Sequence, residues 1–517
     1  MRAILVSNFG RNVRFTPARI YTPRNEDEVL ELLEGHTQRS IRVIGSLHSW
    51  SDAAETGDIL VDMRRFDWIA VPDRTGEEIR VTVGAGCRIR RLMRVLRTKE
   101  SVTLPTVGTV MEQTVAGAIS TGTHGSGRPS LSHFVRAIRV AAYDSQGRPA
   151  IYDWYEGATL EAARCGLGCT GIVLSVTFAC VPAFEVCERV RVHDSIAPIL
   201  SAVAEHPLQE FALVPHKWTY VAYQRRESQV RSSGWKWCAL LLYRAYKWAM
   251  VDCFLHAALK TLLFPCVFGH WGIALSNRFV RFLYRATPLL IGLARMLTGD
   301  RGVVDRSDRA LTRKHHYFRH VEMEIFVPEA YVTDATALIR SITAVCAGDS
   351  VEMSEAVRQA LVKARLLERV DALRGTYLHH YPLYFRRVLP DDTLISMTSR
   401  DSTLNGRSPY YAIGLFCYLG RRRRRRYFEY ASVVALAMIR TFGARLHWGK
   451  YLPVFPDTPL THLVLEPLYP ALPEFRRVCD EVDPRGVFRN SYSRRVLNLA
   501  PVETAADAPQ QTLVAQV

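Results

Sequence analysis

The sequence lacks the cysteine patterns of a disulfide framework or a zinc site. Its 517 residues include eleven cysteines, an odd number, with no C-x-x-C pair and no His/Cys ligand spacing. These absences favour a reducing compartment, and we expect no metal site. The first residues, MRAILVSNFGRNVRF, contain an apolar run of only four residues, which is too short for a secretory signal. We expect an intracellular protein that is cytoplasmic or bound to the surface of a membrane.

The common signatures of nucleotide and nucleic-acid binding are missing too. No G-x-G-x-x-G follows a first strand and no G-x-x-x-x-G-K-[ST] is present, so neither a Rossmann unit nor a P-loop is predicted. Zinc-finger spacing, a helix-turn-helix signature and basic segments interleaved with aromatic residues are also absent. We therefore expect no nucleic-acid partner, despite a net charge of +17.

Acidic residues are scarce relative to basic ones. The chain has 50 Asp and Glu against 67 Lys and Arg, a balance that attracts phosphates or anionic lipid. Six consecutive arginines at 421–426 are the densest point of positive charge. We interpret this run as a solvated loop or the start of a helix.

The composition predicts an ordered protein with more than one domain. Hydrophobic residues make up 48% of the chain and charged residues 23%, which is typical of globular proteins. A chain of this length exceeds one typical core. The last residues, 499–517, are small and polar without periodicity, and we predict a disordered tail there.

Residues 16–185 alternate short β-branched runs with turns and amphipathic helices, which predicts an α+β domain. One helix is expected after a capping Asn25, and another over 88–100, where apolar residues recur at spacings of three and four. A hairpin is expected at 134–153, turning at 144–147. Further strands are predicted at 41–45, 57–63, 78–86 and 171–182.

The second region begins near residue 186 and contains an unusual segment, 235–297. Four tryptophans and many leucines and phenylalanines alternate there with basic residues, and no stretch of about twenty residues is free of charge. Amphipathic helices lying on a membrane surface fit this pattern. Helices packed on the protein's own core fit it equally well. A strand at 320–328 and a helix at 330–345 are predicted to follow.

Three glycine-rich turns in the first region share one physical logic. They are GSLHS at 45–49, VAGAISTGTHGSG at 115–127 and GLGCTGIV at 166–173. Backbone that approaches a pyrophosphate closely needs glycine, and its N–H groups then bind the anion. Together the turns predict a dinucleotide that is held by loops.

Longer motifs make a family resemblance specific. The chain contains, in order, VIGSLHSWSDAA, VTVGAGCRIRRL, TVGTVMEQTVAGAISTGTHGSG, GLGCTGIVLSVTF, YPLYFRR, HWGKYLP and DPRGVFRNSY. Over residues 15–497 it resembles the sugar-1,4-lactone oxidases, which include L-gulono-1,4-lactone oxidase, D-arabinono-1,4-lactone oxidase and alditol oxidase. The resemblance implies an FAD flavoprotein of the vanillyl-alcohol-oxidase type. The implied fold is α+β, with a two-subdomain FAD-binding domain of the PCMH type at 1–185 and a substrate (cap) domain with an antiparallel sheet at 186–498.

The resemblance also implies the cofactor site. His48 stands where covalent members of the family join a histidine to the 8α carbon of the flavin, so we expect covalent FAD. Such a link raises the reduction potential of the flavin and retains it. The implied cofactor-binding residues are Gly45, Ser46, Leu47, His48, Ser49, Gly108, Thr109, Thr114, Gly117, Thr121, Gly122, Thr123, His124, Gly125, Gly168, Gly171, Ile172, Val173 and His447.

The implied catalytic residues are Lys450, Arg386 and Tyr384. Lys450 matches a cation near the flavin, and Arg386 matches an arginine that orients substrate hydroxyls. Tyr384 replaces the family's glutamate, and a phenol is a weaker acceptor for sugar hydroxyls than a carboxylate. Leu436 likewise replaces an acidic residue, so substrate recognition departs from the family pattern.

The resemblance implies oxidation of a sugar-derived hydroxyl, on an aldono-1,4-lactone or a polyol, by hydride transfer to flavin and then to dioxygen with release of hydrogen peroxide. Gly108 favours dioxygen, because oxidases of the family often have glycine there. Two other interpretations stay open at this point. One is a flavin dehydrogenase acting on a lipid-linked or apolar alcohol, and the other is a membrane-surface binding protein in which flavin is structural or absent.

Overall fold

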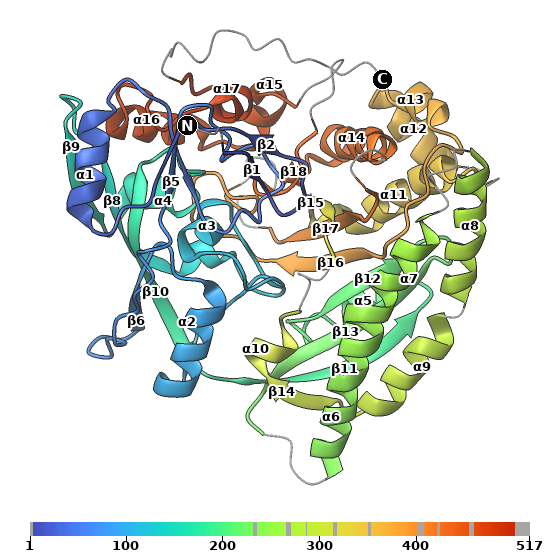
Figure 1. The fold of residues 1–517 in the computed structure, drawn as a ribbon. Coiled ribbons are helices and arrows are strands. Elements are labelled where there is room, and N and C mark those ends of the chain that lie inside the picture. Colours follow the sequence, from blue (N-terminus) through green and yellow to red (C-terminus); the bar gives the residue numbers. More distant parts are fainter. Residues whose placement is uncertain are drawn as a thin grey trace.

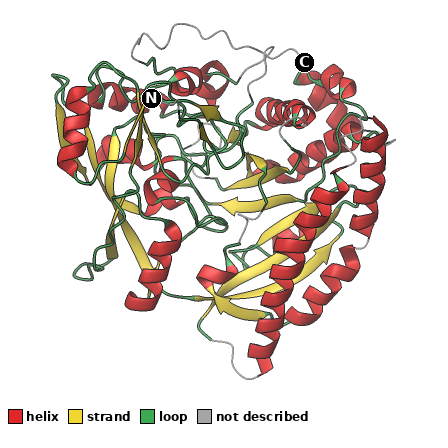
Figure 2. Cartoon of the chain, viewed as in Figure 1, coloured by secondary structure: helices red, strands yellow, loops and turns green. Residues whose placement is uncertain are grey.

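The computed structural model describes residues 4–230, 235–264, 270–285, 287–313, 318–349, 353–400, 408–420, 424–453 and 460–501. Helices and strands alternate throughout these residues (Figures 1 and 2). Most of the predicted tail, from 502 onward, and residues 421–423 of the arginine run lie outside this part.

The N-terminal part contains a small parallel sheet with strand order β3-β5-β4. Helix α1 (Glu26–Gly35) begins after Asn25, whose side chain accepts a hydrogen bond from the backbone N–H of Glu28, as the sequence predicts. The strands of this sheet, and the separate pair formed by β1 and β2, are β1 (Val6–Ser7), β2 (Arg14–Phe15), β3 (Arg19–Tyr21), β4 (Ile41–Ile44) and β5 (Ile59–Asp62).

A second, antiparallel sheet completes the N-terminal part, with order β6-β10-β8-β9 and β7 paired to β10. The predicted hairpin is present, and Gly147 has φ +72° in its turn. The strands are β6 (Ile79–Gly84), β7 (Val102–Thr103), β8 (Val135–Tyr143), β9 (Pro149–Trp154) and β10 (Ile172–Pro182). The helices beside them are α2 (Ile89–Val95), continued by a π-helical turn η1 (Leu96–Glu100), α3 (Val115–Ser120) and α4 (Gly157–Arg164).

A larger antiparallel sheet dominates the second part, and within the described ranges it has eight strands in the order β14-β11-β13-β12-β16-β17-β15-β18. Its presence confirms the predicted cap sheet. The strands are β11 (Glu185–His193), β12 (Glu210–Val214), β13 (Thr219–Ser228), β14 (Val303–Arg306), β15 (Val321–Pro328), β16 (Leu383–Val388), β17 (Tyr410–Cys417) and β18 (Arg445–Leu446).

The described residues between 235 and 298 form helices that cover the outer side of this sheet, at the right of Figure 1. They are α6 (Trp235–Tyr246), a π-helical segment η3 (Lys247–Phe254), α7 (Leu255–Leu262), α8 (His270–Arg285) and α9 (Thr287–Thr298). One side of each helix is packed into the core, through residues such as Leu240, Tyr243, Leu259, Val280 and Ala294. Within the described ranges, no helix combines the length and the apolar character that crossing a membrane requires.

The outward side of these helices exposes several large apolar side chains. Trp248 is 53% exposed, Phe282 70% and Met296 72%. The described part does not cover the side chains of Trp235 and Trp271. The prediction of packing on the protein's own core is therefore correct for one face, and the other face leaves the lipid interpretation open.

The remaining helices flank the sheet and return to the N-terminal part. Helix α14 begins at Arg425, within the arginine run, which confirms the predicted helix start. Arg424, however, is buried and donates to the carbonyl of Leu419 (2.9 Å), so this residue is not solvated as expected. Near the C-terminus, α16 packs against α4, and Figure 1 shows the last helices above the N-terminal sheets. These helices are α5 (Ala197–Ser201), α10 (Ser307–Ala310), α11 (Val332–Cys346), α12 (Glu355–Lys363), α13 (Leu367–Ala372), α14 (Arg425–Phe442), α15 (His462–Leu465), α16 (Leu472–Val482) and α17 (Ser491–Leu497).

The division at residues 185 and 186 stays a prediction, since the C-terminal segment serves both parts. The backbone carbonyl of Val487 accepts a hydrogen bond from the backbone N–H of Ile41 at the start of β4, and Phe488 belongs to the N-terminal core.

The ten described cysteines are free thiols, which agrees with the absence of a disulfide pattern.

Candidate active site

A deep cavity lies where the loops of the N-terminal part meet the open face of the large sheet. The space between its protein atoms, counted out into the open solvent at its mouth, is about 1880 Å³. All but three of the predicted cofactor and catalytic residues line it. Gly122, Gly125 and Ile172 are the exceptions, and they lie beside residues that do line it.

The loop after β4 carries His48 into the cavity wall. The His48 ring stacks on Phe9, with ring centroids 4.9 Å apart. The hydroxyl of Ser49 donates to the carbonyl of Gly449 (3.1 Å), which ties this loop to the HWGK loop. Two loops that are distant in sequence thus hold His48 at one place in the wall.

Glycine is required at several points of this wall. A Cβ on Gly45 would lie 2.2 Å from the Thr114 hydroxyl, and one on Gly171, which has φ +113°, would lie 2.7 Å from the Ala141 carbonyl. Leu47, the residue before His48, is in the left-handed region with φ 55°, a conformation that is costly for leucine. The loops therefore bring bare backbone to the cavity, as the glycine pattern predicts.

A buried arginine that the sequence analysis overlooked joins these loops. The Arg42 guanidinium donates to the carbonyls of Ala53 (2.8 Å), Leu167 (2.6 Å) and Gly168 (3.2 Å), and also to Phe488. Among the described residues it has no carboxylate partner. A buried cation compensated only by carbonyl dipoles favours a nearby anion.

These features fit FAD. Bare backbone, small hydroxyl side chains and a buried cation suit a diphosphate. The loops at 45–49, 108–125 and 167–173 would hold the cofactor, which when bound supplies a two-electron acceptor.

The large sheet presents charged side chains to the same cavity. Alternate residues of a strand share a face, so Glu322 and Glu324 of β15 both point into it. Pairing of the strands sets Glu210 of β12 opposite Arg386 of β16. The Arg386 guanidinium donates to Glu324 at 2.6 Å, and the Lys450 ammonium forms an ion pair with Glu322.

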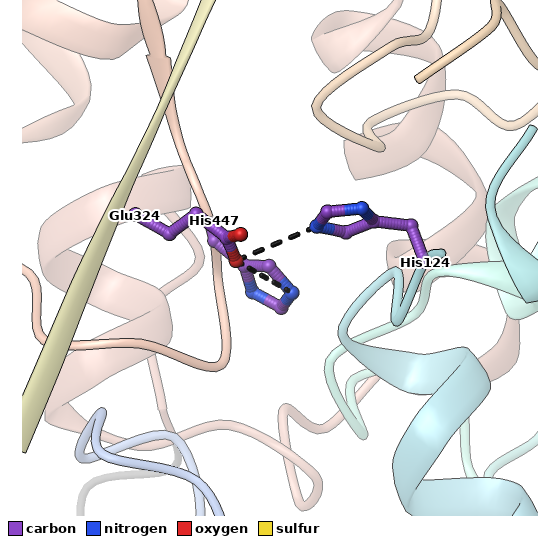
Figure 3. Close-up of side chains that lie close together, drawn as sticks. All are labelled: His124, Glu324 and His447. Carbon is purple, nitrogen blue, oxygen red and sulfur yellow. Dashed lines mark ion pairs between the residues drawn. The ribbon is translucent and has the colours of Figure 1, made fainter. Parts of the chain in front are cut away.

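Two histidines flank Glu324 (Figure 3). Nε2 of His124 lies 3.4 Å from the Glu324 carboxylate and Nε2 of His447 lies 4.0 Å from it. Figure 3 shows His124 reaching Glu324 from the N-terminal part, so the cluster spans both parts of the chain. Such a group resembles a metal site, but Arg386 and Lys450 already place two positive charges on the same carboxylate pair, which disfavours a further cation.

Burial and neighbours separate the acidities of the two glutamates. Burial alone raises the pKa of Glu324, but Arg386, His124 and Lys450 outweigh it and hold that pKa well below its usual range. Burial and the Glu324 charge raise the pKa of Glu322 against the pull of Lys450. The pKa values of His124 and His447 are lowered, mainly by burial.

Tyr384 is engaged by an arginine that the sequence analysis also overlooked. Arg313 donates to the Tyr384 hydroxyl (3.2 Å) and to the Glu210 carboxylate (2.7 Å). Glu210 in turn accepts from Arg225 (2.9 Å), which also pairs with Glu188. The phenol therefore accepts from Arg313, and its own proton is left to be donated.

Aromatic residues form the wall next to Tyr384. Tyr381 lies 5.1 Å from Phe416 between ring centroids, and Tyr384 lies 6.1 Å from Phe416. Leu436 is buried in α14 and does not line the cavity, so its replacement of an acidic residue acts at most indirectly.

Comparison with known proteins places this site in a family. Residues 17–148 match the family model described as FAD binding domain. Residues 176–496, more than half of the chain, match the model described as D-arabinono-1,4-lactone oxidase. The chain belongs to the D-arabinono-1,4-lactone oxidase family. This membership confirms the predicted resemblance, the FAD cofactor and an FAD-dependent oxidase acting on a small molecule.

Relatives of this oxidase differ in their named substrates. A long-chain alcohol oxidase from an uncultured marine euryarchaeote is 36% identical over 491 residues, covering 95% of this chain and 96% of the relative. The L-gulonolactone oxidase of Bos taurus is 24% identical, covering 96% and 98%. A cholesterol oxidase from B. sterolicum has the same fold, with a TM-score of 0.72 at 16% identity over 95% of this chain and 96% of that chain. The predicted α+β fold of the PCMH type is confirmed.

Proposed function

We propose that this oxidase acts on the hydroxyl group of an apolar, long-chain alcohol and passes the electrons to dioxygen, with release of hydrogen peroxide. The observation that carries the proposal is the wall around Tyr384. Tyr381, Tyr384 and Phe416 make this wall aromatic. The Tyr384 hydroxyl accepts a hydrogen bond from Arg313, and Tyr384 stands where the family pattern has a carboxylate that accepts hydrogen bonds from sugar hydroxyls. The long-chain alcohol oxidase at 36% identity supports the same substrate class.

The residues of the cavity suit the chemistry of alcohol oxidation. Arg386, 9% exposed and held by Glu324, is a donor that orients the substrate oxygen. Tyr384 donates its remaining proton to the same oxygen. Lys450 stabilises the negative charge that develops on the cofactor side during hydride transfer. Burial of these groups excludes water and strengthens each interaction.

Covalent attachment of FAD through His48 is part of the proposal. The support is the position of His48 in the wall, where Phe9 and the Gly449 carbonyl hold its loop.

Dioxygen as the electron acceptor has weaker support than the sequence suggested. A Cβ at Gly108 would lie 2.6 Å from the Thr123 methyl group, so close packing alone accounts for the glycine.

The outward face of α6–α9 supports delivery of an apolar substrate from a lipid surface. Residues 235–298 contain eight Lys and Arg against one Asp. Lys260, Arg278, Arg285 and Arg295 are exposed on the same group of helices as apolar side chains such as Trp248. Apolar groups flanked by cations suit an anionic membrane surface. We therefore propose peripheral association with anionic lipid.

A sugar-derived lactone is the second candidate substrate. Glu210, Arg313, Glu322, Glu324 and Arg386 all line the cavity, and together they offer the hydrogen bonds that a polyol needs. The L-gulonolactone oxidases at 24% identity belong with this alternative. We no longer propose a membrane-surface binding protein without flavin chemistry, because the chain belongs to an FAD-dependent family.

Peroxide release with a matched panel separates the two substrates. The panel contains primary alcohols of increasing chain length, the corresponding 1,4-lactones of sugar acids, and a polyol. We expect kcat/KM to rise with chain length, by about 0.8 kcal/mol for each methylene that becomes buried, and to be low for every sugar derivative. A panel in which only lactones release peroxide overturns the proposal.

A further inference from the structure

Two carboxylates on β15 face the cavity with unsatisfied oxygens. Oε1 of Glu322 is buried and has no hydrogen-bond partner among the described residues, and Oε2 of Glu324 is buried with only the ion pair to His124 Nε2 at 3.4 Å as a close contact. The two side chains are only 4% and 1% exposed. Buried carboxylate oxygens are almost always hydrogen-bonded, so Oε1 of Glu322 indicates where a polar group of a ligand binds.

The surroundings give the two carboxylates different roles. Glu324 is fixed as an anion. Its Oε1 accepts a hydrogen bond from Arg386 at 2.6 Å, and the Lys450 ammonium and the His124 ring lie within 4.0 Å of its Oε2. Glu322 has one charged partner, Lys450, on its other oxygen. The Glu322 carboxylate is therefore the one on which a proton is least costly.

We infer that Glu322 is the base that accepts the hydroxyl proton of the substrate. This inference rests on the proposed function only in requiring that a hydroxyl group is oxidised. In the step, the C–H bond of the carbinol carbon breaks and its hydrogen leaves with the electron pair to FAD. The O–H bond breaks, its proton goes to Oε1 of Glu322, and carbon and oxygen are left as a carbonyl.

The arrangement couples this proton to the charge of Lys450. Before the step, Lys450 is paired with Glu322 and lies 4.0 Å from Glu324. Once Glu322 is neutral, the ammonium has lost its closest counter-charge. Its field is then directed at the negative charge that arrives with the electron pair. Proton transfer and electron transfer thus support one another.

The raised pKa of Glu322 agrees with this role, because a general base works best when its pKa approaches the operating pH. The sign of the pH dependence follows. Glu322 must be ionised to accept a proton, so the rate rises with pH through its pKa and then levels off. The charged and titratable groups around Glu322 are Lys450, Glu324, Arg386, His320, Tyr418 and Tyr427.

The experiment compares Glu322→Gln with Glu322→Asp and with a matched control, Glu329→Gln. Glu329 follows the same strand, pairs with Arg387 and does not line the cavity. Holoenzymes are checked by FAD content and circular dichroism. One readout is the anaerobic rate of flavin reduction by the best alcohol of the panel as a function of pH. The other is the infrared band of a protonated carboxyl group, followed in resting enzyme as pH is raised.

We expect Glu322→Gln to slow flavin reduction by about 10²- to 10⁴-fold, to lose the rise with pH and to lack the titrating carboxyl band. Glu322→Asp should recover part of the rate and the rise with pH, and Glu329→Gln should match the parent. A Glu322→Gln enzyme that keeps the rise with pH, or the titrating band, overturns the inference. If Glu322→Gln does not bind FAD, the Glu322→Asp variant decides the question, and the absence of the titrating carboxyl band in that variant overturns the inference equally. If no alcohol reduces the parent enzyme, the proposed function fails, while the infrared titration still tests Glu322.

Discussion

Replacing Lys450 by methionine tests how the cavity uses its charges. The Lys450 ammonium contacts Glu322, lies 4.0 Å from Glu324 and lies 4.5 Å from the centre of the Trp50 ring. Its side chain is 17% exposed, so water screens these interactions only in part. Methionine keeps the length and the contact with Trp50 and removes the charge.

The expected loss can be estimated from these distances. A pair of unit charges 4 Å apart interacts by about 4 kcal/mol at the effective dielectric of a partly buried site. Removing one preorganised charge from an active site commonly costs about 2.7–4 kcal/mol of barrier, or about 10²- to 10³-fold in rate. The pKa of Glu322 should rise further without the cation, so the rise of rate with pH should move to higher pH.

Anaerobic stopped-flow measurement of flavin reduction in Lys450→Met checks both effects. Lys260→Met, an exposed lysine on α7, is the matched control and should leave reduction unchanged. FAD content should stay near that of the parent enzyme, because Lys450 is not part of the loops that would hold the cofactor. An unchanged reduction rate and pH profile in Lys450→Met would remove Lys450 from the catalytic residues and refute the coupling to Glu322.

Three further predictions follow from separate parts of the structure. Acid precipitation should leave the yellow colour in the pellet of the parent and of His36→Ala, and in the supernatant of His48→Ala; colour in the parent's supernatant contradicts the covalent link. Arg225→Met removes the guanidinium that Glu188 and Glu210 share, while Glu188 keeps Lys247 and Glu210 keeps Arg313; this variant should lower the free energy of unfolding by about 1–3 kcal/mol, whereas Arg226→Met, at the exposed neighbouring residue, should change it by less than about 0.5 kcal/mol. Trp248→Ser with Phe282→Ser should abolish co-sedimentation with anionic vesicles at low salt, and Trp68→Ser, on the N-terminal part, should not; equal binding by all three proteins excludes this face as the lipid contact.

The sequence allowed the cofactor side of the cavity to be predicted because its signals are local. Glycines in short turns report a backbone requirement that each turn carries by itself, and Gly45 and Gly171 meet that requirement in the structure. His48 was found through its place in such a loop. The family motifs then supplied roles for Arg386 and Lys450.

The substrate side was harder to predict because its residues act through long-range partners. Glu322 and Glu324 stand two apart in HVEMEIFVP, and that alternation could have indicated a polar face on a buried strand. Only strand pairing shows that this face meets Arg386. Arg42 gave no local signal, since its carbonyl partners come from residues as distant as Leu167 and Phe488.

The outer helices show a limit of composition as evidence. Their apolar content predicted either burial or a lipid surface. In the structure one side of these helices is buried in the core, and the other side exposes apolar side chains. Helical periodicity alone could not assign the two faces, because apolar residues occur around most of the circumference of α6 and α9.

Anaerobic bleaching of the flavin tests the central claim most directly, because it needs neither dioxygen nor a coupled assay. The holoenzyme is mixed without oxygen with a long-chain primary alcohol, and in parallel with a sugar-derived 1,4-lactone at the same concentration. We expect the alcohol to bleach the visible flavin band within seconds and the lactone to leave it unchanged. Bleaching by the lactone alone would contradict the proposed substrate.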